Sequence, residues 1–313
     1  MAWTATPRAS RAPTPQRRRH YEYELVLVTY HSRPLVEALL ANLPAALPVV
    51  IVDNSQGADG VDEMARARQG TRYLAGPGTG FAAGANLGAR SSSYATVVFV
   101  NPDSSPCLAQ LDSLVAEFDR DPQLAVASAT TVLPDGGVEI GVGGWEPSVG
   151  RALVHAIGAH KVFPTAGLWA RPVPGQPIVL DWVSGACMAV PRQLFCNIGG
   201  FDESYFVYNE DVDFGRRIRE AGLRQLVRTD LLVPHLGGGS GEGKTRMLQL
   251  RGASLMLYVR RHNSYLAVHG IRIALTGGYV GRYASCLLRG RRAQSREHAA
   301  YLRGLWTGPP DMT

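Results

Sequence analysis

The sequence lacks the features that mark membrane-spanning, disulfide-rich and repetitive proteins. It contains no run of 18 apolar residues, and its first 20 residues hold five arginines but no apolar stretch resembling a signal peptide. The four cysteines lie far apart and form no CxxC pair, so we expect free thiols in a reducing compartment. We therefore expect a cytoplasmic globular protein that is at most peripheral on the inner face of the membrane.

Acidic residues are scarce at both ends of the chain. Residues 1–20 carry five basic and no acidic groups, residues 21–240 carry 15 basic and 23 acidic groups, and residues 241–313 carry 12 basic and 3 acidic groups. An acidic centre argues against a cleft that follows a nucleic-acid backbone, and it suits a site of carboxylates and a divalent cation. The first 20 residues, rich in Arg and Pro, are expected to be a disordered basic tail.

The middle of the chain alternates strands with helices. Continuous apolar runs at Leu25 to Tyr30, Pro48 to Asp53 and Thr96 to Val100 are typical of strands buried on both faces of a parallel sheet. Helix patterns separate these runs. The alternation predicts an α/β fold with a Rossmann-like, mainly parallel sheet flanked by helices.

The same reading divides the chain into regions. We expect a catalytic domain over residues 21–243, with a nucleotide-binding half at about 21–105 and an acceptor half at about 106–243. Residues 244–313 are expected to form a helical basic C-terminal region, and the Gly- and Pro-rich stretch 134–177 an excursion at the acceptor side.

Polar residues directly follow two of the buried strands. Asp53 leaves the second strand in the motif VDNS, and Asn101 and Asp103 leave a later strand in NPDS. Ligands of such sheets lie beyond the carboxyl ends of the strands. Asp, Asn and Ser also form turns, which is the alternative for either motif alone. Their joint occurrence favours contacts to a nucleoside and a divalent cation on a diphosphate.

A glycine-rich segment opens a later helix. Gly78, Gly80 and Ala83 formally match the dinucleotide fingerprint GxGxxA, but they do not follow the first strand of the sheet. Close packing of the helix on the sheet is an equal alternative. Asn86 stands out as a polar residue among small ones.

Two further motifs favour catalysis. Glu210, Asp211 and Asp213 lie at the start of a predicted helix, where carboxylates commonly only complement the helix dipole. Three of them exceed that need, and one poised below a hydroxyl can accept its proton. His235 directly follows a strand and precedes a glycine-rich loop, a pattern that suits either a ligand or a structural histidine.

The order of these motifs resembles the large inverting GT-A family of bacterial glycosyltransferases called family 2, and within it the rhamnosyltransferase-like members. The resemblance covers roughly residues 24–262. It is carried by LVLVTYHS, VVIVDNS, GTGFAAGANLGAR, VVFVNPDS, DWVSGACMAVPRQLFCNIGGFDESYFVYNEDVDFGRRIREAG and VPHLGGGSG, all in the family's order.

The resemblance implies roles for individual residues. It implies that Asp211 is the catalytic base and that Asp103 and His235 bind Mg2+ or Mn2+. The residues expected to contact the donor are Thr29, Asp53, Asn86, Asn101 and Asp103. Those expected at the acceptor are Trp182, Ser184, Gly185 and Glu210. Asn101 departs from the DxD pattern, where the family's simplest form has aspartate.

The reaction implied is transfer of a sugar from a nucleoside diphosphate to an acceptor hydroxyl with inversion. By resemblance, the first donor is dTDP-L-rhamnose, ahead of UDP-hexoses, and the acceptor is a glycan, glycolipid or small molecule. One alternative is a sugar nucleotidyltransferase, although no glycine-rich, lysine-bearing loop follows the first strand. Another is a catalytically silent module that binds sugar nucleotide or glycan, suggested by Asn101.

The C-terminal region is rich in arginine, interleaved with apolar residues at spacings that fit amphipathic helices. Such helices either lie on an anionic membrane or present a solvated basic face. The arginines concerned are Arg260, Arg261, Arg272, Arg282, Arg289, Arg291, Arg292, Arg296 and Arg303.

Overall fold

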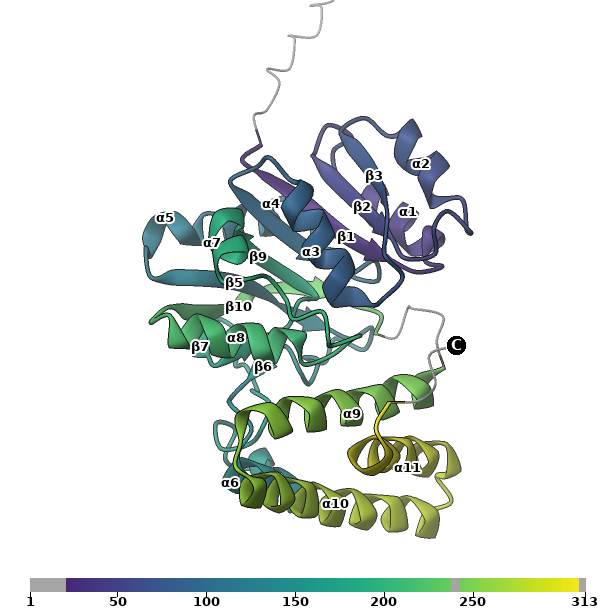
Figure 1. The fold of residues 1–313 in the computed structure, drawn as a ribbon, viewed down its shortest axis with the longest axis vertical. Coiled ribbons are helices and arrows are strands. Elements are labelled where there is room, and N and C mark those ends of the chain that lie inside the picture. Colours follow the sequence, from purple (N-terminus) through teal and green to yellow (C-terminus); the bar gives the residue numbers. More distant parts are fainter. Residues whose placement is uncertain (1–20, 238–242, 310–313) are drawn as a thin grey trace, which may run out of the picture.

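The computed structural model describes residues 21–237 and 243–309. The expected basic tail at 1–20 and the glycine-rich residues 238–242 lie outside the described residues. Figure 1 shows a sheet flanked by helices, with a layer of C-terminal helices below it.

The central sheet is mixed and mostly parallel. Its strand order is β3-β2-β1-β4-β9-β5-β10-β7. Strands β1 to β4 run parallel to one another, and β5 runs parallel to β10, whereas β9 and the edge strand β7 are antiparallel to the strands they pair with. The strands are β1 (Tyr23–Thr29), β2 (Val49–Asp53), β3 (Thr71–Ala75), β4 (Thr96–Val100), β5 (Leu124–Val132), β7 (Ile178–Leu180), β9 (Cys187–Pro191) and β10 (Arg224–Pro234). A small second sheet pairs β6 (Gly143–Gly144) with β8 (Trp182–Val183).

Helices cover both faces of the central sheet, which explains the continuous apolar runs. Leu25 and Leu27 of β1 pack into one core, and Val26 of the same strand packs into the other. The first core is covered by α1 (Arg33–Ala41), α2 (Val61–Ala67), α4 (Leu108–Val115) and α5 (Glu117–Arg120). The second is covered by α3 (Phe81–Ser91), α7 (Arg192–Asn197) and α8 (Glu210–Glu220).

The C-terminal region forms a third packed layer. Its helices are α9 (Lys244–His262), α10 (Tyr265–Leu288) and α11 (Arg292–Thr307), joined by α6 (Val149–Ala156) and the short η1 (Ala159–Lys161) of the central excursion. A methyl group on Gly304 would come 2.1 Å from the carbonyl oxygen of Gln249, so α9 and α11 approach very closely. Trp182 of β8 and Val212 of α8 share this core, which joins the layer to the sheet and its helices.

Two details differ from the sequence expectations. The run from Ile178 to Val190, expected as strand, is divided among β7, β8 and β9. The strand expected at Leu231 to Val233 is the end of the longer β10. Along β10, charged residues such as Asp230 alternate with buried ones such as Thr229, so no continuous apolar run marks its full length. The α/β sheet flanked by helices and the helical C-terminal region are confirmed.

Candidate active site

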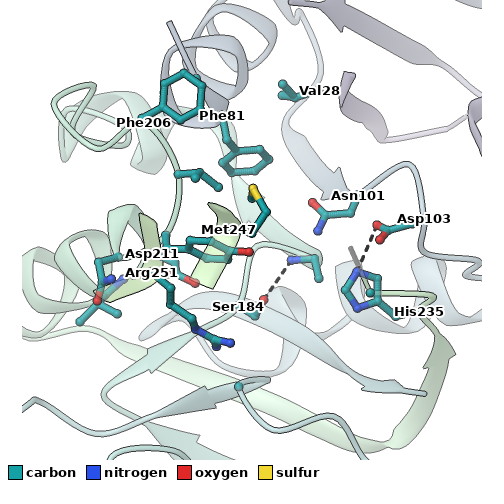
Figure 2. Close-up of a pocket in the computed structure, with 18 of the residues that line it drawn as sticks. Val28, Phe81, Asn101, Asp103, Ser184, Phe206, Asp211, His235, Met247 and Arg251 are labelled. Atoms are coloured by element: carbon teal, nitrogen blue, oxygen red, sulfur yellow. Dashed lines mark hydrogen bonds and ion pairs between the residues drawn. The ribbon is translucent and has the colours of Figure 1, made fainter. Parts of the chain in front are cut away.

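A cavity of about 460 Å³ lies beyond the carboxyl ends of β1, β4 and β10. That volume lies within the range of small-molecule sites. Of the residues expected to act in function, seven line it: Thr29, Asn101, Asp103, Trp182, Ser184, Asp211 and His235. Figure 2 shows Asp103 and His235 on one side of the cavity and Asp211 on the other. The described structure thus brings distant motifs to one cavity.

One end of the cavity is built by the ends of β1 and β2. The buried Oγ1 of Thr29 has no hydrogen-bond partner among the described residues. Asn54 also lines this end, and it donates from Nδ2 to the carbonyl of Gly80 at 2.9 Å and accepts from the amide of Gly78 at 3.2 Å. These bonds hold the glycine segment against β2.

Asp53 does not line the cavity. Its carboxylate is fully buried and accepts bonds from the amides of Ser55 and Gly57 and from the hydroxyl of Tyr73. This is the turn-forming role that competes with nucleoside binding in the sequence. Its neighbour Asn54 occupies the cavity wall instead.

Asn86 is also turned away from the cavity. Its amide donates to the carbonyl of Phe201 and to Glu203, both at 2.8 Å, and its oxygen accepts from the amide of Phe201 at 2.8 Å. The side chain is fully buried, so its bonds fix the segment that leads toward α8. The described geometry gives Asn86 a role in positioning that segment and no contact with the cavity.

Asp103 and His235 meet at the ends of β4 and β10. Oδ1 of Asp103 lies 3.1 Å from Nε2 of His235, and Nδ1 of His235 lies 2.7 Å from a carboxylate oxygen of Glu139. Burial lowers the pKa of His235, but the two carboxylates outweigh it and raise the pKa to about 10. Asn101 lies beside this group on the cavity wall.

The chain turns sharply before Asp211. Tyr208 and Asn209 both have a φ of 67°, in the left-handed region that non-glycine residues seldom adopt. Such residues cost about 1–3 kcal/mol each and concentrate at functional sites. The turn starts α8 so that Asp211 faces the cavity, where its Oδ1 accepts from the amide of Val212 at 2.9 Å. Burial raises the pKa of Asp211 to about 6.

The two neighbouring acids of this cluster have other surroundings. Glu210 is buried, does not line the cavity, and one of its oxygens has no hydrogen-bond partner among the described residues. Burial and the charge of Asp211 raise its pKa well above the usual value. Asp213 forms ion pairs with Arg217 at 2.8 Å and His262 at 2.9 Å. Of the three, only Asp211 reaches the cavity.

The cavity floor is aromatic. Trp182 and Ser184, which the family resemblance assigns to the acceptor, line it together with Trp145 and Trp169. Nε1 of Trp182 donates to the backbone oxygen of Trp145 at 3.3 Å. Gly185 lies next to Ser184 but is not on the cavity wall.

Sequence reasoning missed three charged residues of the cavity, Glu139, Arg246 and Arg251. Glu139 lies in the stretch 134–177, whose structure could not be placed from sequence. Arg246 and Arg251 come from α9, in the C-terminal region whose arginines the sequence analysis assigns to the protein surface. None of the three has a local motif that marks it.

Comparisons with known proteins bear on the family and the fold of this chain. Residues 25–169 match the model of the family described as Glycosyl transferase family 2. An N-acetylglucosaminyl-diphospho-decaprenol L-rhamnosyltransferase of Mycobacterium tuberculosis is 29% identical over 264 residues, which cover 77% of this chain and 85% of that relative. A mannosyltransferase from Pyrobaculum calidifontis in complex with GDP-Man and Mn2+ superposes with a TM-score of 0.58 at 17% identity, covering 95% of this chain and 90% of the other. GalNAc-T7 with UDP, GalNAc and Mn2+ superposes with a TM-score of 0.52 at 16% identity, covering 74% of this chain and 47% of the other.

The fold and these matches define a glycosyltransferase with the GT-A fold. Residues 25–169 match the glycosyl transferase family 2 model, and a rhamnosyltransferase is among the chain's relatives. The family resemblance and the enzyme class expected from the sequence are confirmed. The family match ends before α8, so Asp211 and His235 lie beyond the matched residues.

Proposed function

We propose that this glycosyltransferase moves a sugar from a nucleoside diphosphate to an acceptor hydroxyl, with inversion and with the help of a divalent cation. One observation carries the proposal: a single cavity has the Asp103–His235 pair on one side and the carboxylate of Asp211 on the other. A nucleotide diphosphate and an attacking hydroxyl need groups of these two kinds.

The residues present fit a divalent cation bound together with its substrate. Asp103 offers an oxygen, and His235 offers a nitrogen once cation binding displaces the proton that the carboxylates hold on Nε2. The two atoms lie 3.1 Å apart on the cavity wall. Within residues 21–237 and 243–309, no group of three or more His, Cys, Asp or Glu side chains is arranged to hold a metal ion. Two protein ligands leave room for diphosphate oxygens and water, as is usual for Mg2+. When bound, the cation would neutralise charge on the departing diphosphate.

Asp211 supplies the acid–base step in this proposal. The acceptor oxygen forms a bond to the anomeric carbon, the bond from that carbon to the diphosphate oxygen breaks, and the acceptor proton passes to Asp211. A carboxylate whose pKa is raised toward 6 by burial is a stronger base than an exposed one and is still largely ionised at pH 7. Attack opposite the leaving group inverts the configuration.

The donor and acceptor are proposed by similarity. The relative from M. tuberculosis is named for transfer of L-rhamnose to N-acetylglucosaminyl-diphospho-decaprenol. We therefore propose dTDP-L-rhamnose as the donor and a lipid-linked diphosphate sugar as the acceptor. The neighbours bound to GDP-Man or UDP superpose at under 20% identity, which supports the fold and leaves the nucleobase open.

A donor screen tests the function. We expect the purified protein with Mn2+ to release dTDP from dTDP-L-rhamnose when a lipid-linked N-acetylglucosamine diphosphate is present, and EDTA to stop the release. The sugar product, analysed by NMR, should have inverted anomeric configuration. Release of pyrophosphate from a nucleoside triphosphate would indicate a sugar nucleotidyltransferase instead. Stabilisation by sugar nucleotides without any turnover would indicate a silent binding module.

We further propose that the C-terminal layer contacts an anionic membrane on the cytoplasmic side. Among the described residues, no helix is long and apolar enough to cross a membrane. However, α10 presents an outward stripe of exposed apolar side chains at helical spacing, namely Leu266, Ile273, Val280, Leu287 and Leu288. Exposed arginines at 289, 291 and 292 follow the stripe directly. Apolar side chains flanked by arginine match the boundary of an anionic bilayer, where each arginine adds about 1 kcal/mol of attraction.

Vesicle sedimentation tests the membrane surface. We expect binding to anionic vesicles that weakens with salt, and Ile273→Asp with Val280→Asp is expected to weaken it at least about tenfold, because two apolar side chains that would enter the bilayer are lost. Val179→Asp, on the exposed edge strand β7, is the matched control. If the wild-type protein does not bind anionic vesicles, the proposed membrane-binding surface on α10 is wrong. If the wild-type protein is a dimer and the α10 variant is a monomer, the apolar stripe of α10 binds a second copy of the chain instead of a membrane.

A further inference from the structure

Arg251 reaches the cavity from the C-terminal layer. It lies on α9, and its guanidinium carbon is 5.6 Å from the ring centre of Trp169 and 5.4 Å from that of Tyr208. Both rings also line the cavity. The two aromatic contacts hold a flexible side chain in one position, so the charge is fixed in advance of ligand binding.

The guanidinium has no carboxylate partner in the part of the chain that the structure describes. The guanidinium packs over the two aromatic rings, and no ion pair or hydrogen bond joins it to another described side chain. Asp211 and Glu139 are near enough for Arg251 to lower the pKa of each, but neither lies within ion-pair distance. Arginine carries five N–H donors that suit phosphate oxygens, and most of them are available here.

The backbone opposite Arg251 leaves room for it. Gly141 has a φ of 114°, and a methyl group there would come 2.8 Å from Nη2 of Arg251. A side chain at this position would therefore press on the guanidinium. The 139–141 segment, α9 and the aromatic rings together form a built pocket for a positive charge.

We propose that Arg251 binds a phosphate of the acceptor, which makes the acceptor an anionic, phosphate-bearing sugar. The inference rests on the proposed function. Figure 2 shows Arg251 on the side of Asp211, whereas the Asp103–His235 pair that serves the donor diphosphate lies across the cavity. A phosphate on the acceptor sugar then lies beside Arg251 while its hydroxyl faces Asp211. The negative charges of Asp211 and Glu139 disfavour an anion at their own sides, and Arg251 is the positive group that lies on the side of Asp211.

Two acceptors that differ only in the diphosphate test this assignment. One is N-acetylglucosamine linked through a diphosphate to a short alkyl chain, and the other is the same alkyl glycoside without the diphosphate. We expect Arg251→Gln to raise the KM of the first acceptor about 10- to 100-fold, the usual value of a hydrogen bond to a charged group. The KM of the second acceptor and that of the donor should change less than about threefold. Arg251→Lys should restore part of the loss, and Arg260→Gln, exposed near the end of the same helix, is the matched control.

A binding measurement separates this inference from the proposed reaction. An alkyl diphosphate without sugar, added in EDTA with saturating dTDP, should raise the melting temperature of the wild-type protein and of Arg260→Gln but not of Arg251→Gln. Equal stabilisation of all three proteins would overturn the assignment whether or not transfer is observed. Equal loss on both acceptors, with a shifted acidic limb of the pH profile, would show that Arg251 acts through Asp211 instead. Failure of transfer with selective stabilisation intact would overturn the proposed function alone.

Discussion

Asp211→Asn is expected to lower the rate of transfer about 100- to 10,000-fold, because the acceptor proton loses its base. Binding of the nucleoside diphosphate should be nearly unchanged, since Asp211 lies across the cavity from Asp103 and His235. Steady-state kinetics and isothermal titration with dTDP measure the two effects separately. In the wild-type enzyme, kcat should fall as the pH drops through about 6, where Asp211 gains its proton, and should level off above that pH.

Glu210→Gln is the matched control for this prediction. Glu210 is the preceding residue, is buried away from the cavity, and has a raised pKa that favours the neutral form, which glutamine resembles. Its replacement should cost far less activity than that of Asp211. If Asp211→Asn keeps more than about a tenth of the wild-type rate, Asp211 is not the base.

Asp103→Ala is expected to remove the dependence on metal and to lower transfer about 100-fold or more, because the cation loses one of its two protein ligands. Binding of the nucleoside diphosphate in Mn2+ should fall to the level that the wild-type protein shows in EDTA. Asp62→Ala, on α2 and outside the cavity, is the control. A wild-type rate that EDTA leaves unchanged would refute the metal assignment of Asp103 and His235 together.

The parallel strands could be predicted because their burial is local. In β1, alternate residues enter two different cores, so the strand has a continuous apolar run. The direction of β9 could not be predicted in this way. It depends on pairing with β4 and β5 on either side, and pairing partners far along the chain leave no local pattern.

The same difference between local and long-range information decides which site residues could be predicted. Residues at strand ends, such as Asp103 and His235, could be placed because parallel strands end at one edge. The family resemblance implies Asn86 at the donor, yet its partner is the backbone of Phe201, 115 residues away. Arg251 reaches the cavity only through the packing of α9, and charge patterning along one helix carries no such information.

The close packing of α9 and α11 limits which substitutions the C-terminal layer can accept during evolution. Met247, Arg251, Leu255 and Tyr301 of the C-terminal layer line the same cavity as Asp211. A chain truncated after residue 243 would therefore lose one wall of the cavity, and the apolar side chains of Trp182 and Val212 would be exposed to water. The layer cannot be exchanged between enzymes as an independent module. A substitution within these helices that reshapes the cavity wall would fall at positions that also pack the layer against Trp182 and Val212.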